Sequence, residues 1–344
     1  MVEKEIAVVI LNYNGSSHLQ KFLPSVMKFS ASASVYVIDN ASSDDSVEIL
    51  KEKFTEVNVI LNEKNFGFAE GYNNGLLKIK GNYPFFVLLN SDVEVTENWL
   101  ENLKEIFKND QEVVAVQPKI LSFQNKASFE YAGAAGGFID RYYYPFCRGR
   151  IFNEIELNLN QYESNTEVSW TSGAAMMVRS DVFLKMGGFD PDFFAHMEEI
   201  DWCLRAKSLG YKLLFCPDST VYHLGGGTLS YDSPLKTYLN FRNNLTLIIK
   251  NHQGYLFPIL FLRLSLDGLA AISFLFSGKP KLLFSVFKAH MYTYRNLFKT
   301  LTKRKKIKNQ HNHSLLKFNG SILWNYYVLK NRKYTLLNKR RFEL

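Results

Sequence analysis

The first 120 residues alternate short apolar runs with segments in which apolar residues recur at helical spacing. The apolar runs predict strands at residues 6–11, 35–39, 57–61, 85–89 and 113–117. The helical pattern falls between them, near residues 18–29, 46–54, 69–79 and 98–107. Strands that alternate with helices in this way predict parallel βαβ units, with helices on both faces of one sheet.

The next 120 residues are less regular. Residues 121–168 are irregular and aromatic, and we predict that they form variable loops. Further strands are predicted at residues 168–171, 174–178, 212–215 and 220–223. Two helices are expected among them: a short one that Ser180 caps and that stops at Gly187 and Gly188, and one at residues 196–209 that Gly210 ends.

The character of the chain changes beyond residue 240. Residues 255–276 are very apolar, but Arg263 and Asp267 interrupt them, and the longest uncharged stretch is residues 268–278. That stretch is well short of the roughly 18 residues needed to cross a bilayer. Each charge would cost about 2.5–3.5 kcal/mol at the bilayer centre. We therefore expect no spanning helix here.

A basic stripe follows the apolar segment. Lys281, Lys288 and Arg295 recur every seven residues, and Lys299 and Lys303 continue the series. The apolar residues beside the stripe are Leu283, Phe284, Val286, Phe287, Met291 and Phe298. The pattern fits a helix lying in a membrane interface, and it also fits an amphipathic helix packed on the body. The cluster of cations at residues 303–308 favours the membrane, because each basic residue near an anionic leaflet contributes about 1 kcal/mol.

Length and charge indicate two parts. The chain of 344 residues exceeds the usual size of one domain, so we predict an α/β domain at residues 1–240 and a basic, amphipathic helical extension at residues 241–344. Residues 301–344 hold twelve Lys or Arg and one acid, a net of +11 that leaves −3 for the rest of a chain carrying +8. Such a tail suggests an anionic partner, either nucleic acid or the inner leaflet of a membrane. We expect the membrane and no nucleic acid.

Cysteine usage and the N-terminus indicate the compartment. Cys147, Cys203 and Cys216 form no disulfide framework, and an odd count suits a reducing cytoplasm. The N-terminus has neither a basic segment nor a small-residue cleavage site before the first predicted strand. We expect a cytoplasmic protein without a signal peptide.

Polar residues interrupt an apolar run at Asn90, Ser91 and Asp92. In open α/β sheets, ligands bind outside the carboxyl ends of the strands. A carboxylate there can hold a divalent cation through one or two oxygens and leave positions for a substrate diphosphate. Taken alone, the three residues also fit a polar turn. The features that follow favour a ligand site.

The first two predicted strands also end in short polar side chains. Asn12 and Asn14 follow the first strand, and Asp39 and Asn40 end the second. These ends lie side by side in a parallel sheet, where a nucleotide would bind. The Asp39 carboxylate can accept a hydrogen bond from a pyrimidine N–H or a ribose hydroxyl. Residues 43–44 fit a helix N-cap, a role that can coexist with binding.

Further candidates lie in loops and at a strand end. Asn65 and Gly67 follow the third predicted strand, and Gly67 would let the backbone approach a phosphate or serve a tight turn. His223 ends a strand before residues 225–227, which are all glycine, and can reach a metal or a diphosphate there, although a lone histidine is more often structural. Downstream donors suited to phosphate oxygens are Lys236, Arg242, Asn243 and Asn244.

Two adjacent acids open the helix predicted at residues 196–209. Glu198 and Glu199 would lie in its first turn, where the helix dipole favours negative charge, so they also fit an ordinary capped helix. Asp201 and Arg205 are four residues apart and should pair on one face. The functional interpretation is a general base at the lip of a cleft, whose proton affinity a neighbouring carboxylate raises.

These residues, in this order, resemble the family 2 glycosyltransferases, and most closely the subgroup of rhamnosyltransferases and related cell-surface polysaccharide enzymes. The similarity covers roughly residues 5–250. It is carried by Val-Ile-Leu-Asn-Tyr-Asn-Gly at 9–15, Val-Ile-Asp-Asn-Ala-Ser-Ser-Asp at 37–44, Asn-Phe-Gly-Phe-Ala at 65–69, Leu-Asn-Ser-Asp-Val at 89–93, Gly-Gly-Phe-Asp at 187–190 and Glu-Glu-Ile-Asp-Trp-Cys-Leu-Arg at 198–205. The resemblance implies the GT-A fold, a Rossmann-like nucleotide-binding core with a mixed, mostly parallel sheet.

The resemblance also implies roles for the candidate residues. The family's Asp-X-Asp metal motif corresponds to Asn90-Ser91-Asp92, so Asp92 would take Mg²⁺ or Mn²⁺, with Asn in place of the first Asp. Glu199 falls at the position of the catalytic base, with Glu198 and Asp201 as supporting acids. His223 would help to bind metal or diphosphate, and Arg242 diphosphate or acceptor. The nucleotide-binding residues would be Asn12, Asn14, Asp39, Asn40, Asn65, Gly67, Asn90 and Ser91.

The implied reaction is an inverting transfer by a single displacement. A sugar, with rhamnose as one candidate, would pass from a nucleoside-diphosphate sugar to a glycan or polyprenyl-diphosphate-linked glycan in cell-surface polysaccharide synthesis. A lipid-linked acceptor would explain a peripheral protein on the inner face of the cell membrane. The alternatives are another donor, such as a UDP-hexose or galactofuranose, or a non-catalytic nucleotide-sugar-binding protein. A nucleotidylyltransferase is disfavoured because Asn12-Tyr13-Asn14-Gly15 replaces its Gly-rich, Arg-containing loop.

Overall fold

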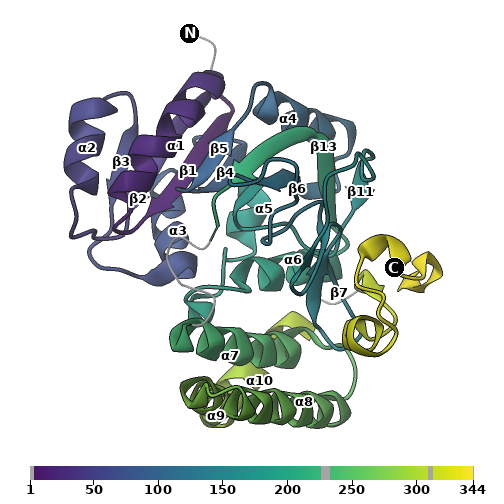
Figure 1. Ribbon diagram of the computed structural model, residues 1–344. Coiled ribbons are helices and arrows are strands. Elements are labelled where there is room, and N and C mark those ends of the chain that lie inside the picture. Colours follow the sequence, from purple (N-terminus) through teal and green to yellow (C-terminus); the bar gives the residue numbers. More distant parts are fainter. Residues whose placement is uncertain (1–3, 226–232, 309–312, 344) are drawn as a thin grey trace.

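The computed structural model describes residues 4–225, 233–308 and 313–343. Its centre is a nine-stranded sheet in which eight strands follow the order β11-β13-β6-β12-β4-β1-β2-β3, and β5 pairs with β13 (Figure 1). Helices cover both faces of this sheet, and a layer of helices lies beneath it. The mixed, mostly parallel sheet confirms the predicted fold class.

The N-terminal half consists of the predicted βαβ units. Its strands are β1 (Ile6–Asn12), β2 (Ala33–Asp39), β3 (Asn58–Leu61), β4 (Phe85–Asn90) and β6 (Val113–Ser122). Its helices are α1 (Ser16–Phe29), α2 (Ser46–Lys53), α3 (Gly67–Lys78) and α4 (Trp99–Asn109). β1 pairs in parallel with both β2 and β4, so the carboxyl ends of these three strands meet at one edge.

The second half inserts antiparallel strands into the sheet. β12 (Ala175–Arg179) runs antiparallel between β4 and β6, and α5 (Ser180–Lys185) follows it. The strand predicted at residues 168–171 is wrong, because regular pairing instead occurs at β11 (Thr166–Glu167) and β12. The two strands predicted at 212–215 and 220–223 are one strand, β13 (Lys212–His223), whose register against β6 shifts between Cys216 and Thr220. β5 (Val93–Val95) pairs with its far end, and α6 (Glu198–Ser208) precedes it.

Residues 121–168 are more ordered than the predicted loops. Four short strands form a separate sheet in the order β10-β9-β8-β7. They are β7 (Gly137–Ile139), β8 (Pro145–Cys147), β9 (Arg150–Ile151) and β10 (Glu154–Ile155). The side chains of Phe138 and Phe146 are buried, so the aromatic character of this region reflects a core rather than a variable surface.

The hydrophobic core lies on both faces of the large sheet. Ala7 and Val9 of β1 belong to one buried cluster, and Val8 and Ile10 to the other. Successive strand residues point to opposite faces, so a strand buried on both sides is apolar at every position. This explains the continuous apolar run of β1.

Four helices form the lower layer and a short C-terminal segment returns to the body. They are α7 (Pro234–Asn251), α8 (Leu256–Phe276), α9 (Pro280–Arg295) and α10 (Leu297–Lys308). The short elements are η1 (Pro191–Phe193) before α6, and β14 (Lys317–Phe318), η2 (Trp324–Val328), η3 (Tyr334–Leu336), η4 (Lys339–Arg341) and β15 (Phe342–Glu343) at the end of the chain. The boundary predicted at residue 240 falls inside α7, which the two parts of the chain share.

Candidate functional site

The carboxyl ends of β1, β2 and β4 bring the predicted nucleotide-side residues together. Asn12 lies opposite Asp39, and Leu11 lies opposite Asn90, in the registers of the parallel pairs. Asn12 and Asp39 are both buried, and the Asn12 amide donates to Asp39 Oδ1 at 3.0 Å. Ser42 donates to the same carboxylate through its hydroxyl (2.6 Å) and its backbone N–H (2.9 Å). The carboxylate is therefore held firmly at the strand ends.

Three of the predicted nucleotide-binding residues also join the surrounding loops to one another. The Asn14 side-chain oxygen accepts from the backbone N–H of Ser43 at 2.7 Å. The Asn40 amide donates to Asn65 Oδ1 at 3.0 Å and to the Gly67 carbonyl at 2.9 Å. These bonds tie the ends of β1, β2 and β3 into one rim.

Gly67 has a structural reason to be glycine, as in the predicted alternative of a tight turn. Its φ is +74°, and a Cβ there would lie 2.5 Å from the ring of Phe194 and 2.7 Å from the Phe194 carbonyl oxygen. That carbonyl accepts from the backbone N–H of Phe68 at 2.6 Å and of Ala69 at 3.2 Å. Glycine is needed because the loop before α6 packs directly against the start of α3.

Asp92 and His223 meet beside the strand ends. His223 Nε2 lies 3.1 Å from Asp92 Oδ1 and 3.4 Å from the Asn90 amide nitrogen. Burial acts to raise the pKa of Asp92, but the hydrogen bond and charge of His223 outweigh it, so the pKa lies below its usual value. Burial likewise acts to lower the pKa of His223, and the carboxylates of Asp92 and Glu130 raise it to about 10.

Glu130 is a site residue that sequence reasoning missed. Its Oε2 lies 3.2 Å from His223 Nδ1, so the ring is held between two carboxylates. The side chain is buried, and a Cβ on Gly225 would lie 2.6 Å from its Oε1. Glu130 comes from a stretch with no periodic pattern or motif, and only the fold brings it to the end of β13.

Asp92 and His223 fit two ligands of one divalent cation. Asp92 Oδ1 and His223 Nε2, which lie 3.1 Å apart, are the carboxylate oxygen and imidazole nitrogen that would hold the cation. Among the described residues, no group of three or more His, Cys, Asp or Glu could hold an ion. The protein would thus supply two ligands, and substrate oxygens and water the others.

Glu198 and Glu199 open α6 after a loop of unusual backbone. Phe194, His196 and Met197 have backbone φ angles of 62°, 69° and 69°, which residues other than glycine seldom adopt. Glu198 is buried, and Glu199 is partly exposed. In each, Oε2 is buried without a hydrogen-bond partner among the described residues, as expected of an acid that awaits a substrate group or carries a proton.

Burial shifts the titration of both acids. It raises the pKa of Glu199 to about 7, although backbone N–H groups at the start of α6 act in the other direction. Burial, and then the charge of Glu199, raise the pKa of Glu198 well above its usual value. Burial therefore favours the protonated form of Glu198 more than an ordinary glutamate's, and it makes the Glu199 carboxylate a stronger base than an ordinary glutamate.

The segment Gly173–Ala174 connects the two halves of the site. The Ala174 carbonyl accepts from the backbone N–H of Asn90 at 2.9 Å. A Cβ on Gly173 would lie 3.7 Å from Cβ and Cγ of Glu199. Glu199 and the Asn90–Asp92 turn therefore flank the same two residues at one edge of the sheet.

Comparison with known proteins identifies the family. The sequence profile described as Glycosyl transferase family 2 matches residues 7–184, more than half of the chain. The chain belongs to this family. Its relatives include N-acetylglucosaminyl-diphospho-decaprenol L-rhamnosyltransferase of Mycobacterium tuberculosis, 20% identical over 263 residues, and dTDP-rhamnosyl transferase RfbF of Shigella flexneri, 24% identical over 276 residues. These alignments cover 73% and 75% of this chain and 86% and 84% of the relatives.

Solved structures of glycosyltransferases share the fold. GalNAc-T7 with UDP, GalNAc and Mn²⁺ superposes with a TM-score of 0.54 and 21% identity over 72% of this chain, which spans about half (48%) of that longer protein. The mannosyltransferase PcManGT from Pyrobaculum calidifontis, in complex with GDP-Man and Mn²⁺, has a TM-score of 0.50 and 14% identity, with 89% and 85% of the two chains covered. The predicted GT-A fold and the resemblance to rhamnosyltransferase-like members of family 2 are thus confirmed.

Two predicted site residues of this family 2 glycosyltransferase serve the fold instead. Asp201 is fully buried and accepts from Arg205 (3.0 Å), Lys250 (2.8 Å) and Asn251 (2.9 Å), so it is not a supporting acid at the lip of the cleft. Its pairing with Arg205 is the predicted one.

Arg242 likewise does not reach toward a diphosphate. Its guanidinium donates to the carbonyls of Asp192 at 3.0 Å and Phe193 at 2.6 Å. The neighbouring Asn243 amide donates to the carbonyls of Phe193 (3.0 Å), Ala195 (2.8 Å) and His196 (2.6 Å). Together Arg242 and Asn243 clamp the loop that leads into α6.

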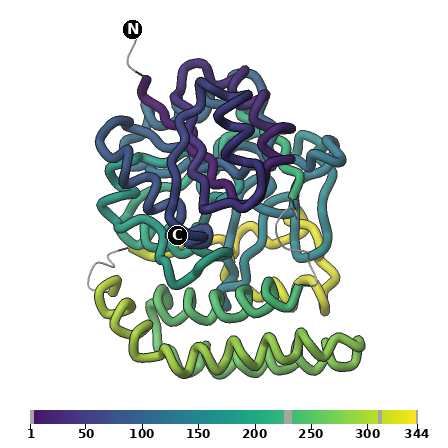
Figure 2. Tube along the Cα trace, turned by 90° about the vertical axis from the view of Figure 1, so that its left-hand side faces the viewer, coloured from purple at the N-terminus to yellow at the C-terminus, as the bar shows by residue number. Residues whose placement is uncertain are grey.

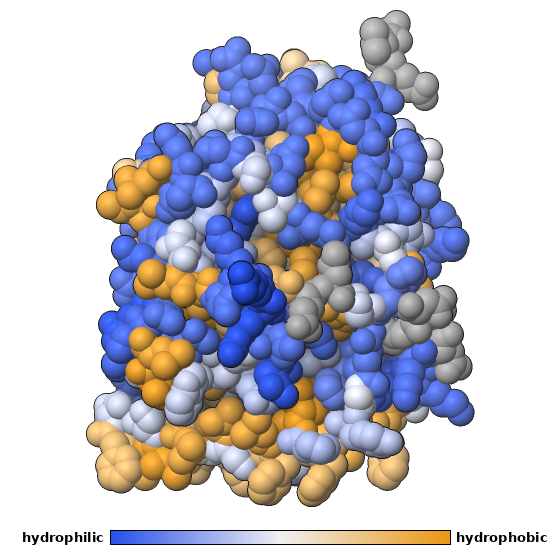
Figure 3. Space-filling model, turned by 90° about the vertical axis from the view of Figure 1, so that its right-hand side faces the viewer, coloured by the Kyte–Doolittle hydropathy of each residue, from blue (hydrophilic) through white to orange (hydrophobic). Residues whose placement is uncertain are grey.

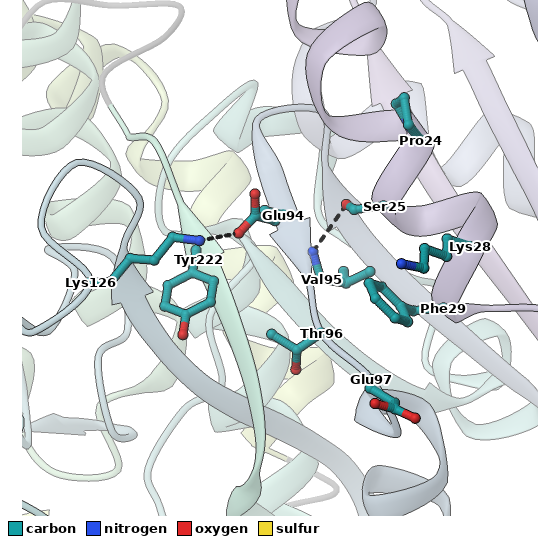
Figure 4. Close-up of a pocket in the computed structure, with 10 residues that line it drawn as sticks. All are labelled: Pro24, Ser25, Lys28, Phe29, Glu94, Val95, Thr96, Glu97, Lys126 and Tyr222. Carbon is teal, nitrogen blue, oxygen red and sulfur yellow. Dashed lines mark hydrogen bonds and ion pairs between the residues drawn. The ribbon is translucent and has the colours of Figure 1, made fainter.

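A pocket of about 450 Å³ lies apart from this site, between α1 and β5 (Figure 4). It is lined by Pro24, Ser25, Lys28, Phe29, Glu94, Val95, Thr96, Glu97, Lys126 and Tyr222. Tyr222 lies opposite Glu94 in the β13–β5 pair, and successive strand residues point to opposite faces. The pocket is therefore on the other side of this strand pair from His223, and none of the predicted site residues lines it.

Proposed function

We propose that this glycosyltransferase moves a sugar from a nucleoside diphosphate to a hydroxyl of a glycan or lipid-linked glycan, with inversion at the anomeric carbon. The observation that carries the proposal is the shared position of Glu199 and the Asn90–Asp92 turn on either side of Gly173–Ala174. A base and a diphosphate-binding carboxylate at opposite sides of one sugar are what a single displacement requires.

Glu199 is the proposed general base. Its carboxylate would take the proton of the acceptor hydroxyl as that oxygen bonds to the anomeric carbon. The bond from that carbon to the nucleoside diphosphate breaks on the opposite face, and the diphosphate leaves with the electron pair. A pKa of about 7 suits this role, because about half of the groups are then unprotonated at neutral pH and the carboxylate binds a proton more tightly than an ordinary glutamate does.

Asp92 and His223 are the proposed ligands of Mg²⁺ or Mn²⁺. Their position at the strand ends supports this role, and the two structural neighbours described above were solved with Mn²⁺. A cation bound there would offset the negative charge that develops on the departing diphosphate. Because a metal binds the neutral imidazole, its binding would displace the proton that His223 carries between Asp92 and Glu130.

Asn12, Asn14, Asp39, Asn40 and Asn65 are proposed to form the rim that receives the nucleotide, with Asn90 and Ser91 at its diphosphate end. The names of two relatives support a rhamnosyl donor, because one is a dTDP-rhamnosyl transferase and another an L-rhamnosyltransferase. We therefore propose a nucleoside-diphosphate rhamnose, with dTDP as the nucleotide.

The acceptor is proposed to be linked to a polyprenyl diphosphate. The mycobacterial relative carries N-acetylglucosaminyl-diphospho-decaprenol in its name, and such an acceptor is held in a membrane. The exposed cations of the lower helical layer support a peripheral position on the anionic inner face of the cell membrane. The enzyme would then build cell-surface polysaccharide from the cytoplasmic side.

The proposal is tested by incubating the purified protein with individual nucleotide sugars and polyprenyl-diphosphate acceptors, with Mn²⁺, Mg²⁺ or EDTA. We expect transfer that depends on the metal, with kcat falling at least roughly 100-fold in both Asp92→Ala and Glu199→Gln. Only Asp92→Ala should weaken metal-dependent nucleotide binding, which calorimetry measures. Full activity of both variants would refute the site assignment.

A further inference from the structure

The outer surface of the lower helical layer is apolar to an unusual extent. On α8, the side chains of Phe257, Phe261, Leu269 and Phe276 are 79%, 66%, 63% and 87% exposed. The other large apolar side chains exposed on α8, α9 and α10 or beside them are Tyr255, Ile272, Leu275, Phe284, Phe287, Tyr294 and Phe298. Figure 3 shows hydrophobic surface along the lower edge of the molecule, where this layer lies. A patch of this kind marks an interaction surface.

The charges within α8 do not interrupt this surface, because they face the body. Arg263 and Asp267 are both buried, lie 3.9 Å apart, and have His290 of α9 beside Asp267 at 3.5 Å. Arg263 also donates to the Tyr142 carbonyl at 2.6 Å and lies 3.7 Å from the centre of the Tyr144 ring. These charges therefore do not prevent the outer face of α8 from lying in a membrane interface.

α8 lies flat beneath the body rather than projecting from it. By length and composition alone it could cross a membrane, and among the described residues it is the one helix that could. However, α8 packs along α9 and α9 packs along α7, which belongs to the layer next to the sheet (Figures 1 and 2). A spanning helix would have to leave these contacts and carry Arg263 and Asp267 into hydrocarbon without their partners.

The positive charge around the apolar face indicates which kind of partner binds there. Between residues 252 and 308 the sequence has a single acid, Asp267, and it is buried. Lys279, Lys281, Lys288 and Arg295 are exposed beside the aromatic side chains. Two copies of such a surface would repel each other, whereas anionic lipid headgroups would attract it.

We propose that the outer face of α8 and α9 is a membrane-docking surface that lies in one leaflet of an anionic bilayer, with its aromatic side chains below the headgroups and its cations among them. The proposal deepens the peripheral placement given above and rests on the proposed function only for the reason why the enzyme docks. α10 is bonded to Asp190 and Asp192 ahead of the catalytic helix. The leaflet would thus lie beneath the catalytic loop, where a lipid-linked acceptor can reach it.

Vesicle flotation of the full chain tests the docking surface. We expect binding to phosphatidylcholine vesicles containing phosphatidylglycerol, and at least tenfold weaker binding for the triple variant Phe257→Ser, Phe261→Ser, Phe276→Ser. The matched control is Leu157→Ser with Leu159→Ser, two apolar side chains that are 52% and 74% exposed and follow β10 in the sequence. Because all five side chains are exposed, the variants should fold, which thermal unfolding and nucleotide binding check. Equal flotation of the triple variant and wild type would overturn the proposal.

The depth of α8 in the bilayer distinguishes a helix that lies in one leaflet from a helix that spans the membrane. Cys147, Cys203 and Cys216 are buried, so a dye can be attached selectively to Phe261→Cys. We expect quenching by nitroxides placed near the headgroup and little by nitroxides at the bilayer centre, since an interfacial helix sits about 5–10 Å into the boundary. Central quenching would show a spanning helix and overturn the proposal.

The experiments also distinguish membrane docking from dimerisation, and docking from sugar transfer. A dimer that the triple variant dissociates, without vesicle binding by wild type, would assign the face to a second copy and overturn the proposal. The vesicles contain neither donor nor acceptor, so docking is measured independently of transfer. Loss of flotation with transfer to a soluble acceptor intact would separate this inference from the proposed function.

Discussion

At the scale of single residues, burial gives two neighbouring glutamates different chemistry. Glu198 is buried with a pKa raised well above its usual value, while Glu199 is partly exposed with a pKa raised to about 7. The more exposed carboxylate is the one that a substrate hydroxyl can reach, which supports the proposal of Glu199 as the base. Their order in the sequence alone does not distinguish these roles.

The pKa of Glu199 predicts the pH dependence of transfer. Below about pH 7 the carboxyl is increasingly protonated, so kcat should fall by about tenfold per pH unit well below the pKa and level off above it. Glu198→Gln, which replaces the buried carboxyl group by an amide of similar shape, should keep most of the wild-type rate and the same inflection. Initial rates at saturating donor from pH 5 to pH 9 measure both. Loss of activity in Glu198→Gln with retention in Glu199→Gln would reverse the assignment.

Residue types at the strand ends could be predicted from sequence, but their partners could not. Asn12, Asp39 and Asp92 lie where the alternation of strands and helices places them, because parallel strands end at the same edge. Arg242 and Asp201 were predicted on chemical type alone, and each is bound by residues distant in sequence. The local sequence does not show whether a guanidinium or carboxylate forms its hydrogen bonds with distant residues of the protein or with a substrate.

At the scale of elements, the loop from η1 to α6 fixes the position of the start of α6. Three of its residues have positive φ, and two groups hold it: the side chains of Arg242 and Asn243 from α7, and the N–H groups of Phe68 and Ala69 from α3. A backbone in sparsely populated conformations persists only when its surroundings fix it. The start of α6, and Glu199 with it, therefore depends on two other helices.

Asn243→Ala tests the clamp. The substitution removes three hydrogen bonds to the loop, which should lower the free energy of unfolding by about 1–3 kcal/mol. A shift of Glu199 should lower kcat by roughly 10- to 100-fold with little change in donor KM. Asn325→Ala is the control, because it removes a buried amide that donates to Ser321 in the C-terminal segment. The clamp is excluded if both variants lose stability and neither loses kcat.

Elements with a local period were predicted well, and elements made by distant pairing were not. The predicted helices and strands of the first 120 residues match the observed ranges within two residues, except that β6 extends five residues further, because each buries one regular face or a continuous apolar run. The sheet of β7 to β10 consists of strands of two or three residues, too short for any period to show. β13 was divided in two because its register shifts at Pro217–Ser219, where polar residues interrupt the strand.

At the scale of the whole molecule, the basic extension is part of the fold rather than a free tail. Lys303 bonds to Asp190 Oδ1 at 2.6 Å and Asp192 Oδ2 at 2.7 Å, and Arg304 donates to the carbonyls of Ile249 and Gly254. Phe318 and Phe342 pack with Phe138 and Phe146 of the small sheet. Net charge predicted an anionic partner for this region, and for Lys303 that partner is within the same chain.

Lys303→Met should weaken the contact between α10 and the loop of Asp190 and Asp192. Lys303 is partly exposed and Asp190 keeps Lys250 as a partner at 2.5 Å, so the expected cost is only about 1 kcal/mol. Hydrogen exchange should nevertheless increase across α10 and the segment of Asp190 and Asp192. Lys305→Met, an exposed lysine on the same helix, is the matched control and should leave exchange unchanged.

The same contact predicts how the extension responds to acid. Burial acts to raise the pKa of Asp190, but Lys250 and Lys303 outweigh it and lower the pKa below the ordinary 3.8, and the pKa of Asp192 is lowered as well. A depressed carboxyl pKa stabilises the folded state above the unfolded value and loses that contribution as pH falls through the folded one. Exchange in α10 should thus be constant from pH 8 to pH 5, after correction for intrinsic rates, and increase only below about pH 4. An increase between pH 7 and pH 5 would show that another group holds α10, and that these aspartates do not join the lower helical layer to the loop before α6.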